Sequence, residues 1–116
     1  SYATITNSSA SDVDGNRYSK FFFRGVQSGN ERSNLASINA YHDGGADDQK
    51  GRLSFHTNDG DDDDLPGNRM VILSDGDVGI GVADPGNKLQ VLDGASAFAF
   101  NEYNNDSKLV LYQGDL

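Results

Sequence analysis

The chain has no cysteine, has half as many basic as acidic residues, and contains no long apolar run. Without cysteine, no disulfide supports the fold, and the sequence does not reveal its redox compartment. The net charge of −9 argues against nucleic acid and anionic membrane surfaces as partners, because both attract basic patches. No stretch approaches the ~18 consecutive apolar residues that span a membrane, so we expect no membrane insertion.

Large apolar residues are also scarce. Leu, Ile, Val and Phe together contribute 26 of the 116 residues, only slightly above the level at which disorder is expected. The length fits a single domain covering residues 1–116. With so few large apolar side chains, one chain alone would have a thin core, and association with further copies is the usual remedy.

Helical periodicity is missing, because no window of a dozen residues keeps an apolar face at helical spacing. Short alternating runs separated by Asx-Gly and Asn-rich turns indicate an all-β fold. The expected strands are 3–6, 18–26, 35–42, 52–57, 69–73, 78–82, 88–92, 97–102 and 108–112. Residues 36–44 and 52–60 echo each other, which fits either successive rungs of a β-helix or two adjacent hairpin arms.

The most informative segment is VGIGVADPGNKLQV, residues 78–91. Val78, Ile80 and Val82 alternate with small residues, which predicts a strand with one apolar face. The intervening glycines have no side chain on the opposite face, and glycine within a strand marks a place where another backbone approaches closely. We therefore expect this segment to pack tightly rather than to carry chemistry.

The Asp-Pro-Gly-Asn run at residues 84–87 is typical of a turn, and Leu89 and Val91 then restore the apolar alternation. The segment resembles the V-G-I-G-T-x-x-P-x-x-K-L-x-V segment of phage tail fibres and tailspikes, with Val82 where that family usually has Thr. The strand and turn pattern just upstream is similar to the family's lead-in, so the resemblance covers roughly residues 51–92 of one fibre domain.

The resemblance implies a homotrimer of intertwined β-strands, β-helix-like or β-prism-like, located in the tail fibre of a virion. A self-cleaving chaperone often follows in such proteins, and no segment here resembles one, which predicts a mature or shortened form. The implied function is attachment to a host cell-surface saccharide or protein receptor without cleavage. The alternatives are a polysaccharide depolymerase domain of a tailspike and a purely structural fibre connector.

Apolar and aromatic strand residues are the candidates for assembly. Phe21 and Phe23 point to one side of their strand and Phe22 to the other, which predicts packing on both sides. A receptor-facing aromatic ring is the alternative. The residues expected in a shared core or subunit interface are Phe21, Phe23, Val78, Ile80, Val82, Leu89 and Val91.

Candidate receptor contacts are Tyr41, His42 and Tyr103, because aromatic rings beside amides and carboxylates suit saccharides. The alternative is that the tyrosines are ordinary strand residues. His42 and His56 are the only histidines, and neither lies in a metal-binding pattern, so we expect strand-end surface histidines and no metal.

Enzyme and cofactor signals are weak. The acidic run at residues 59–64 lacks the spacing of a calcium loop, so a solvated acidic loop is expected and calcium binding is the alternative. The only glutamates, Glu31 and Glu102, lie far apart, and no nucleophile, phosphate-loop or zinc motif occurs. We therefore expect no catalytic activity and no cofactor.

Overall fold

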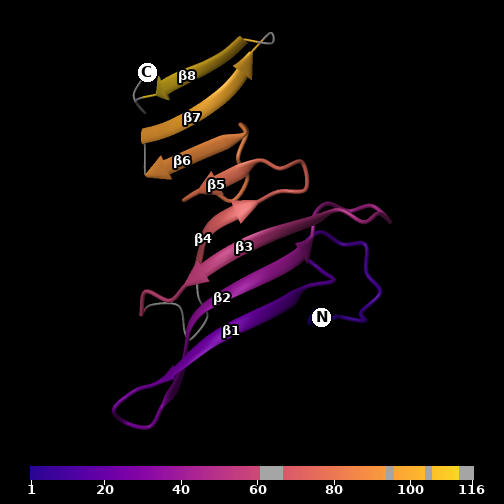
Figure 1. Ribbon diagram of the computed structural model, residues 1–116, viewed down its shortest axis with the longest axis vertical. Coiled ribbons are helices and arrows are strands. Elements are labelled where there is room, and N and C mark those ends of the chain that lie inside the picture. Colours follow the sequence, from indigo (N-terminus) through magenta and orange to yellow (C-terminus); the bar gives the residue numbers. More distant parts are fainter. Residues whose placement is uncertain (61–66, 94–95, 104–105, 113–116) are drawn as a thin grey trace.

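The computed structural model describes residues 1–60, 67–93, 96–103 and 106–112, with side chains as far as Leu92 (Figure 1). Its strands are β1 (Ser19–Val26), β2 (Arg32–His42), β3 (Gly51–Thr57), β4 (Gly67–Ile72), β5 (Val78–Ile80), β6 (Leu89–Asp93), β7 (Ser96–Tyr103) and β8 (Asp106–Tyr112). They form one eight-stranded sheet in chain order, parallel only between β5 and β6. The all-β prediction is confirmed, and the described residues include no helix that could cross a membrane.

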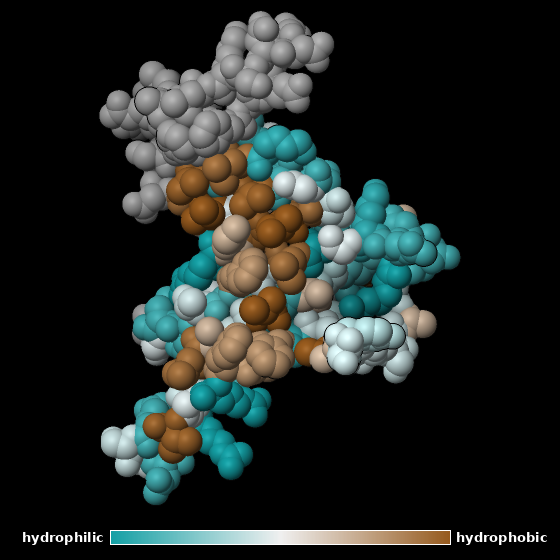
Figure 2. All heavy atoms as spheres, viewed as in Figure 1, coloured by the Kyte–Doolittle hydropathy of each residue, from teal (hydrophilic) through white to brown (hydrophobic). Residues whose placement is uncertain are grey.

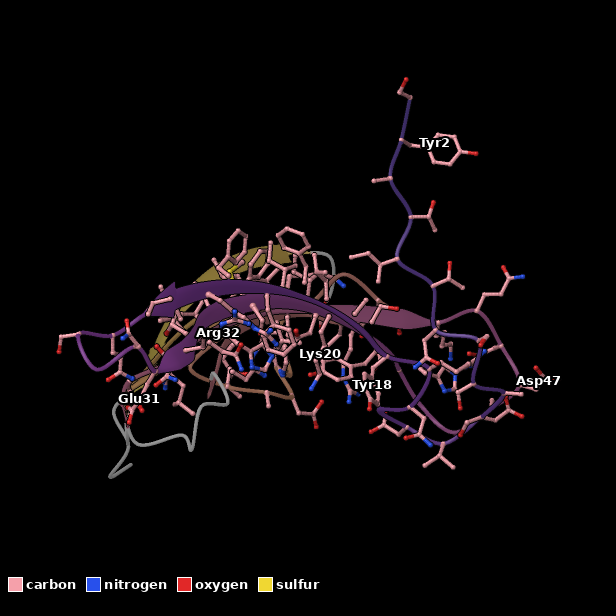
Figure 3. The ribbon with its side chains drawn as sticks, turned by 90° about the horizontal axis from the view of Figure 1, so that it is seen from below. Tyr2, Tyr18, Lys20, Glu31, Arg32 and Asp47 are labelled. Atoms are coloured by element: carbon pink, nitrogen blue, oxygen red, sulfur yellow. The ribbon has the colours of Figure 1, made fainter. Side chains whose placement is uncertain are left out.

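The expected strand at residues 3–6 is wrong, because this N-terminal segment pairs with no strand among the described residues. Beside the start of β1, the Asn7 side chain donates to the Tyr18 carbonyl at 2.7 Å and Ser19 Oγ donates to the Ile5 carbonyl at 3.4 Å. Figure 3 shows the segment with Tyr2 leading away from the sheet, on the side opposite Tyr18. Alternation alone does not make a strand when no edge is within hydrogen-bonding reach.

The echo between residues 36–44 and 52–60 has a simple structural basis. β2 and β3 are antiparallel neighbours in which Ile38 faces Phe55 and His42 faces Gly51. The two segments are therefore arms of one hairpin, joined by residues 43–50, and not rungs of a β-helix.

The glycine strand is shorter than expected. Gly81 has a φ of +74°, which ends β5 after Ile80 and turns the chain into the 81–88 connection. Val82 consequently does not continue the apolar alternation. Its side chain folds back beside Gly79, so that a Cβ at Gly79 would meet both Val82 and Val71. The expected close backbone approach at this glycine is confirmed, whereas the placement of Val82 on the same face as Val78 and Ile80 is wrong.

Strand register separates the sheet into two chemically different faces. On one, the apolar face, a row of cross-strand partners consists of Phe21, Ile38, Phe55, Met70, Ile80 and Val91. A neighbouring row consists of Ser19, Ala40, Leu53, Ile72, Val78 and Leu89. The other, the polar face, carries a row consisting of Lys20, Asn39, Ser54, Val71, Gly79 and Gln90.

Exposure does not follow the polarity of the two faces, because large apolar side chains are exposed on the apolar face. Among the described residues, Val71 is the one buried hydrophobic side chain, and it lies on the polar face. On the apolar face, Phe21 is 50% exposed, Phe23 46% and Ile80 41%. Figure 2 shows these apolar side chains as a continuous band along the long axis of the molecule. The strands lie across that axis and are stacked along it (Figure 1).

The shape agrees with a single open layer. The radius of gyration is 17.1 Å, against about 13 Å for a compact domain of this length. Two packed layers normally cover the apolar side of a sheet. Because the described part of the chain supplies no second layer over the apolar face, that side has no hydrophobic core.

Candidate functional site

The polar face carries a cavity of about 560 Å³ above β3 and β4. Its floor comes from these strands, and its walls come from the turn that carries Asp14, from the start of the β2–β3 loop and from the 81–88 connection. The lining side chains with polar groups include Tyr41, Arg52, Ser54, His56, Asn68 and Asp84. Leu73 and Ala83 add apolar surface to the same cavity, and Val71 is buried in its floor.

The floor of the cavity follows from strand alternation. Ser54 and His56 are two residues apart on β3 and therefore share a face, and Ser54 Oγ lies 2.9 Å from His56 Nε2. Asn68 on β4 is the cross-strand partner of His56. Tyr41 on β2 accepts a hydrogen bond from the Asn39 amide at 3.0 Å through its hydroxyl, which fixes the position of the ring.

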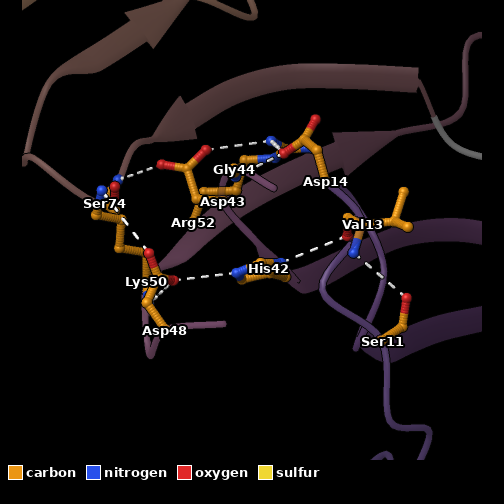
Figure 4. A network of polar contacts seen from close by, with 10 residues as sticks. All are labelled: Ser11, Val13, Asp14, His42, Asp43, Gly44, Asp48, Lys50, Arg52 and Ser74. Atoms are coloured by element: carbon orange, nitrogen blue, oxygen red, sulfur yellow. Dashed lines mark hydrogen bonds and ion pairs between the residues drawn. The ribbon is translucent and has the colours of Figure 1, made fainter. Parts of the chain in front are cut away.

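One side of the cavity is held by an ionic network centred on Arg52 (Figure 4). Arg52 Nη1 donates to Asp14 Oδ1 at 2.7 Å and to Asp43 Oδ1 at 3.2 Å. Backbone N–H groups complete the network, since Gly44 donates to Asp14 Oδ1 at 2.9 Å and Ser74 donates to Asp43 Oδ2 at 2.8 Å. Four segments that lie far apart in the sequence are thereby tied together at the cavity.

These contacts keep the carboxylates ionised. The hydrogen bond from the Gly44 backbone, followed by that from Arg52, lowers the pKa of Asp14. Burial by itself would raise the pKa of Asp43, but hydrogen bonds from Ser74 and Arg52 outweigh it and lower that pKa. Burial likewise opposes the charge of Arg52, and the two carboxylates overcome it and raise its pKa.

His42 has a different environment from the surface position that the sequence predicted. Its side chain is 1% exposed, with Nε2 3.1 Å from Asp48 Oδ1 and Nδ1 3.4 Å from the Val13 carbonyl. Figure 4 shows the ring between the loop that carries Asp48 and the N-terminal turn. The prediction of a surface histidine is wrong, and so is His42 as an accessible receptor contact, because the loop and the turn enclose the ring.

The other predicted receptor contacts do not come together in the described part of the chain. Tyr41 lines the cavity, and the guanidinium of Arg52 lies over its ring, 5.6 Å from the centroid. Tyr103 belongs to β7, where side chains lie outside the described residues. The cavity instead gathers Ser54 and His56, which sequence reasoning missed. The signal available in the sequence was that polar residues alternate with two large apolar residues within 52–57, which places the polar side chains together on one face of the strand.

The residues predicted for assembly gather on the apolar face with one exception. Phe21 and Phe23 pack edge-to-face, with ring centroids 5.0 Å apart. Val78 and Leu89 are cross-strand partners in one apolar row, and Ile80 and Val91 in the other. The exception is Val82, which lies beside Gly79 on the polar side.

Within the described residues, no three His, Cys, Asp or Glu side chains are grouped so that they could hold a metal ion. Most of the acidic run at 59–64 lies outside the described residues, so the calcium alternative stays a prediction. The cavity can offer hydroxyl, imidazole, amide and carboxylate groups beside apolar patches.

No model of a protein family matches the chain, and no curated protein matches its sequence.

Proposed function

We propose that this chain is a fibre domain of a phage tail fibre or tailspike, which assembles as a homotrimer through its apolar face. In this proposal it attaches the virion to a polymer on the host cell surface and does not cleave it. The resemblance of residues 78–91 to tail-fibre segments supports the family. The uncovered apolar face is the single observation that carries the assembly.

The best partner for the apolar face is the same face of further copies. The band runs along the long axis, so its partner must be equally long and equally apolar. Neither apolar row from β1 to β6 contains a charged residue. Copies can therefore meet without burying the carboxylates that give each chain its charge of −9, and burial of an unpaired charge is the main penalty that such a contact must avoid.

Threefold packing follows from the way in which the strands are stacked. Because they lie across the long axis, three such sheets can stand around a parallel axis as the sides of a prism, with apolar faces inward. The three polar faces, each with its cavity, then point outward. A face-to-face sandwich of two copies is the competing arrangement, and it would hide the same rows.

Assembly is tested by static light scattering coupled to size exclusion. We expect a mass three times the 12.4 kDa of one chain. A stable monomer at micromolar concentration would reject the assembly, and a mass of two chains would reject the prism. Attachment is tested by labelling susceptible cells with the fluorescent trimer and with a chain kept monomeric by a charge on the apolar face. Threefold avidity can add 10²–10⁴-fold, so only the trimer should decorate cells.

Binding without turnover is favoured over depolymerase activity by the state of two of the cavity carboxylates, Asp14 and Asp43. A glycosidase needs one carboxylic acid whose pKa is raised so that it stays protonated. Asp14 and Asp43 instead have lowered pKa values and are bound to Arg52. Chromatography of host glycans incubated with the domain is the measurement. Oligosaccharide release that a cavity carboxylate variant abolishes would favour the depolymerase.

A further inference from the structure

We infer that the polar-face cavity binds an uncharged sugar unit of the surface polymer and discriminates against acidic sugars. This inference deepens the proposed function and rests on it for the supply of a surface polymer. It names where the polymer is held and which charge class of sugar is accepted.

The cavity lies on the side of the sheet that assembly leaves open. On β3, Ser54 and His56 line the cavity, whereas Leu53 and Phe55, which alternate with them along the strand, belong to the apolar rows. Packing of apolar faces therefore leaves all three cavities accessible, one on each outer face of the prism. A polymer with repeating units can then engage more than one cavity at a time.

The composition of the cavity suits a saccharide. Its volume of about 560 Å³ lies within the ~300–1,000 Å³ range of small-molecule sites. The exposed Asn68 amide and Asp84 carboxylate offer hydrogen-bonding groups from two different elements, while Leu73 and Ala83 offer apolar surface beside them. Ser54 and His56, hydrogen-bonded to each other, form a polar floor beneath. A sugar ring presents the matching pair of surfaces, with hydroxyl groups around its rim and C–H groups on its faces.

The charges around the cavity select against acidic sugars. Its three carboxylates are Asp14, Asp43 and Asp84, and its one cation, Arg52, is shared by the first two. Asp84 is exposed and makes no hydrogen bond or ion pair with any described residue. Its oxygens are therefore available to accept hydrogen bonds from sugar hydroxyls. A uronic or sialic acid would bring a like charge next to this carboxylate, whereas a neutral hexose or an N-acetylhexosamine would not.

The cavity is held in shape without a ligand. The contacts of Arg52 with Asp14 and Asp43, and of the Ser74 backbone with Asp43, connect the walls on one side. Binding would then cost little ordering of the protein, which matters for a small site with few contacts. Single-site affinity near the millimolar range is the expectation for such a site, and avidity supplies the rest.

The test is saturation-transfer difference NMR on the assembled full chain with trisaccharides of equal length. Maltotriose, cellotriose and chitotriose are the neutral probes, and trigalacturonate is the acidic probe. We expect at least one neutral probe to bind and trigalacturonate to bind at least tenfold more weakly than it. Absence of binding by every neutral probe at tens of millimolar would overturn the inference, as would equal or tighter binding of trigalacturonate.

Two exposed substitutions then locate the site. Asp84→Ala and Asn68→Ala each remove one hydrogen-bonding group and should weaken the neutral probe roughly fivefold to tenfold. Asp47→Ala is the matched control for Asp84→Ala, because it removes one exposed carboxylate from a loop outside the cavity. Equal melting temperatures establish that the variants are folded. Parental affinity in both cavity variants would overturn the site, as would equal weakening by the control.

The outcomes separate this inference from the proposed function. If the trimer decorates cells but Asp84→Ala and Asn68→Ala leave its binding of neutral sugars unchanged, the proposed function stands and the cavity is rejected as the binding site. A monomer whose sugar binding depends on both residues rejects the trimer and keeps the cavity. Asp84→Arg adds a direct check of charge selection, because it should raise the affinity for trigalacturonate relative to the neutral probes.

Discussion

Replacing Ile80 by aspartate tests most directly whether the apolar face is covered. Ile80 lies between its cross-strand partners Met70 and Val91 in the apolar row that begins at Phe21. In a single chain it is 41% exposed, so a carboxylate there would keep much of its hydration and cost little. In an assembly with apolar faces inward, the same carboxylate would be buried without a partner.

The two situations differ in free energy by enough to be distinguished. An unpaired charge at a covered apolar site costs about 3–5 kcal/mol per chain. Three copies around one axis make the total on the order of 10 kcal/mol per trimer, before repulsion between the carboxylates is added. Every 1.4 kcal/mol changes an equilibrium constant about tenfold, so we expect dissociation at concentrations where the parent is fully assembled.

Dissociation of the assembly is measured by light scattering across a micromolar dilution series and by the concentration dependence of the melting temperature. The matched control is Val26→Asp, which adds the same charge to a valine that is 66% exposed at the end of β1. Val26 pairs with Arg32, which Figure 3 places on the same side of the sheet as Lys20, away from the apolar face. If Ile80→Asp assembles and melts like the parent and the control, the assembly argument is refuted.

Three further substitutions or conditions test the local geometry. Gly81→Ala should destabilise the fold by more than about 1 kcal/mol, because φ is +74° and the new Cβ would meet the Leu92 backbone. The control is Gly29→Ala, whose Cβ would stand in open space and should not destabilise the fold. Equal melting temperatures of the two variants would contradict this prediction. Arg52→Ala should cost about 2 kcal/mol in chemical denaturation, because it leaves two carboxylates without their shared cation, and a loss below 0.5 kcal/mol would count against the network. Asp14 and Asp43 have lower pKa values in the folded chain than the 3.8 of an unfolded aspartate, so their ionised forms stabilise the fold. This contribution to the free energy of unfolding is complete above pH 3.8, and it is lost as the pH falls through the pKa values of the folded state. A melting temperature that is constant from pH 7 to 5 and falls below pH 3.8 is expected, and a maximum below pH 3.8 would reverse the sign.

The sequence by itself determined the class of fold and most of its strands. Within residues 52–57, two large apolar residues alternate with polar ones, and this period of two fixes which side of β3 is apolar whatever the strand pairs with. The scarcity of large apolar residues already predicted a chain that cannot complete a core alone. Both inferences use only local geometry and composition, which a single chain carries in full.

Only the tertiary structure decided which side chains meet and which are hidden. Asp14 and Arg52 are 38 residues apart, and their contact depends on how two loops fold beside the sheet. Tertiary packing also encloses His42 while leaving His56 at the cavity, although both histidines lie near strand ends. Strand register brings Asn68 opposite His56, and the left-handed backbone at Gly81 turns the following connection over the polar face. Alternation of apolar and polar residues specifies which face of a single strand a side chain lies on. Strand register and loop closure specify which side chains from distant segments become neighbours, and the cavity depends on those neighbours.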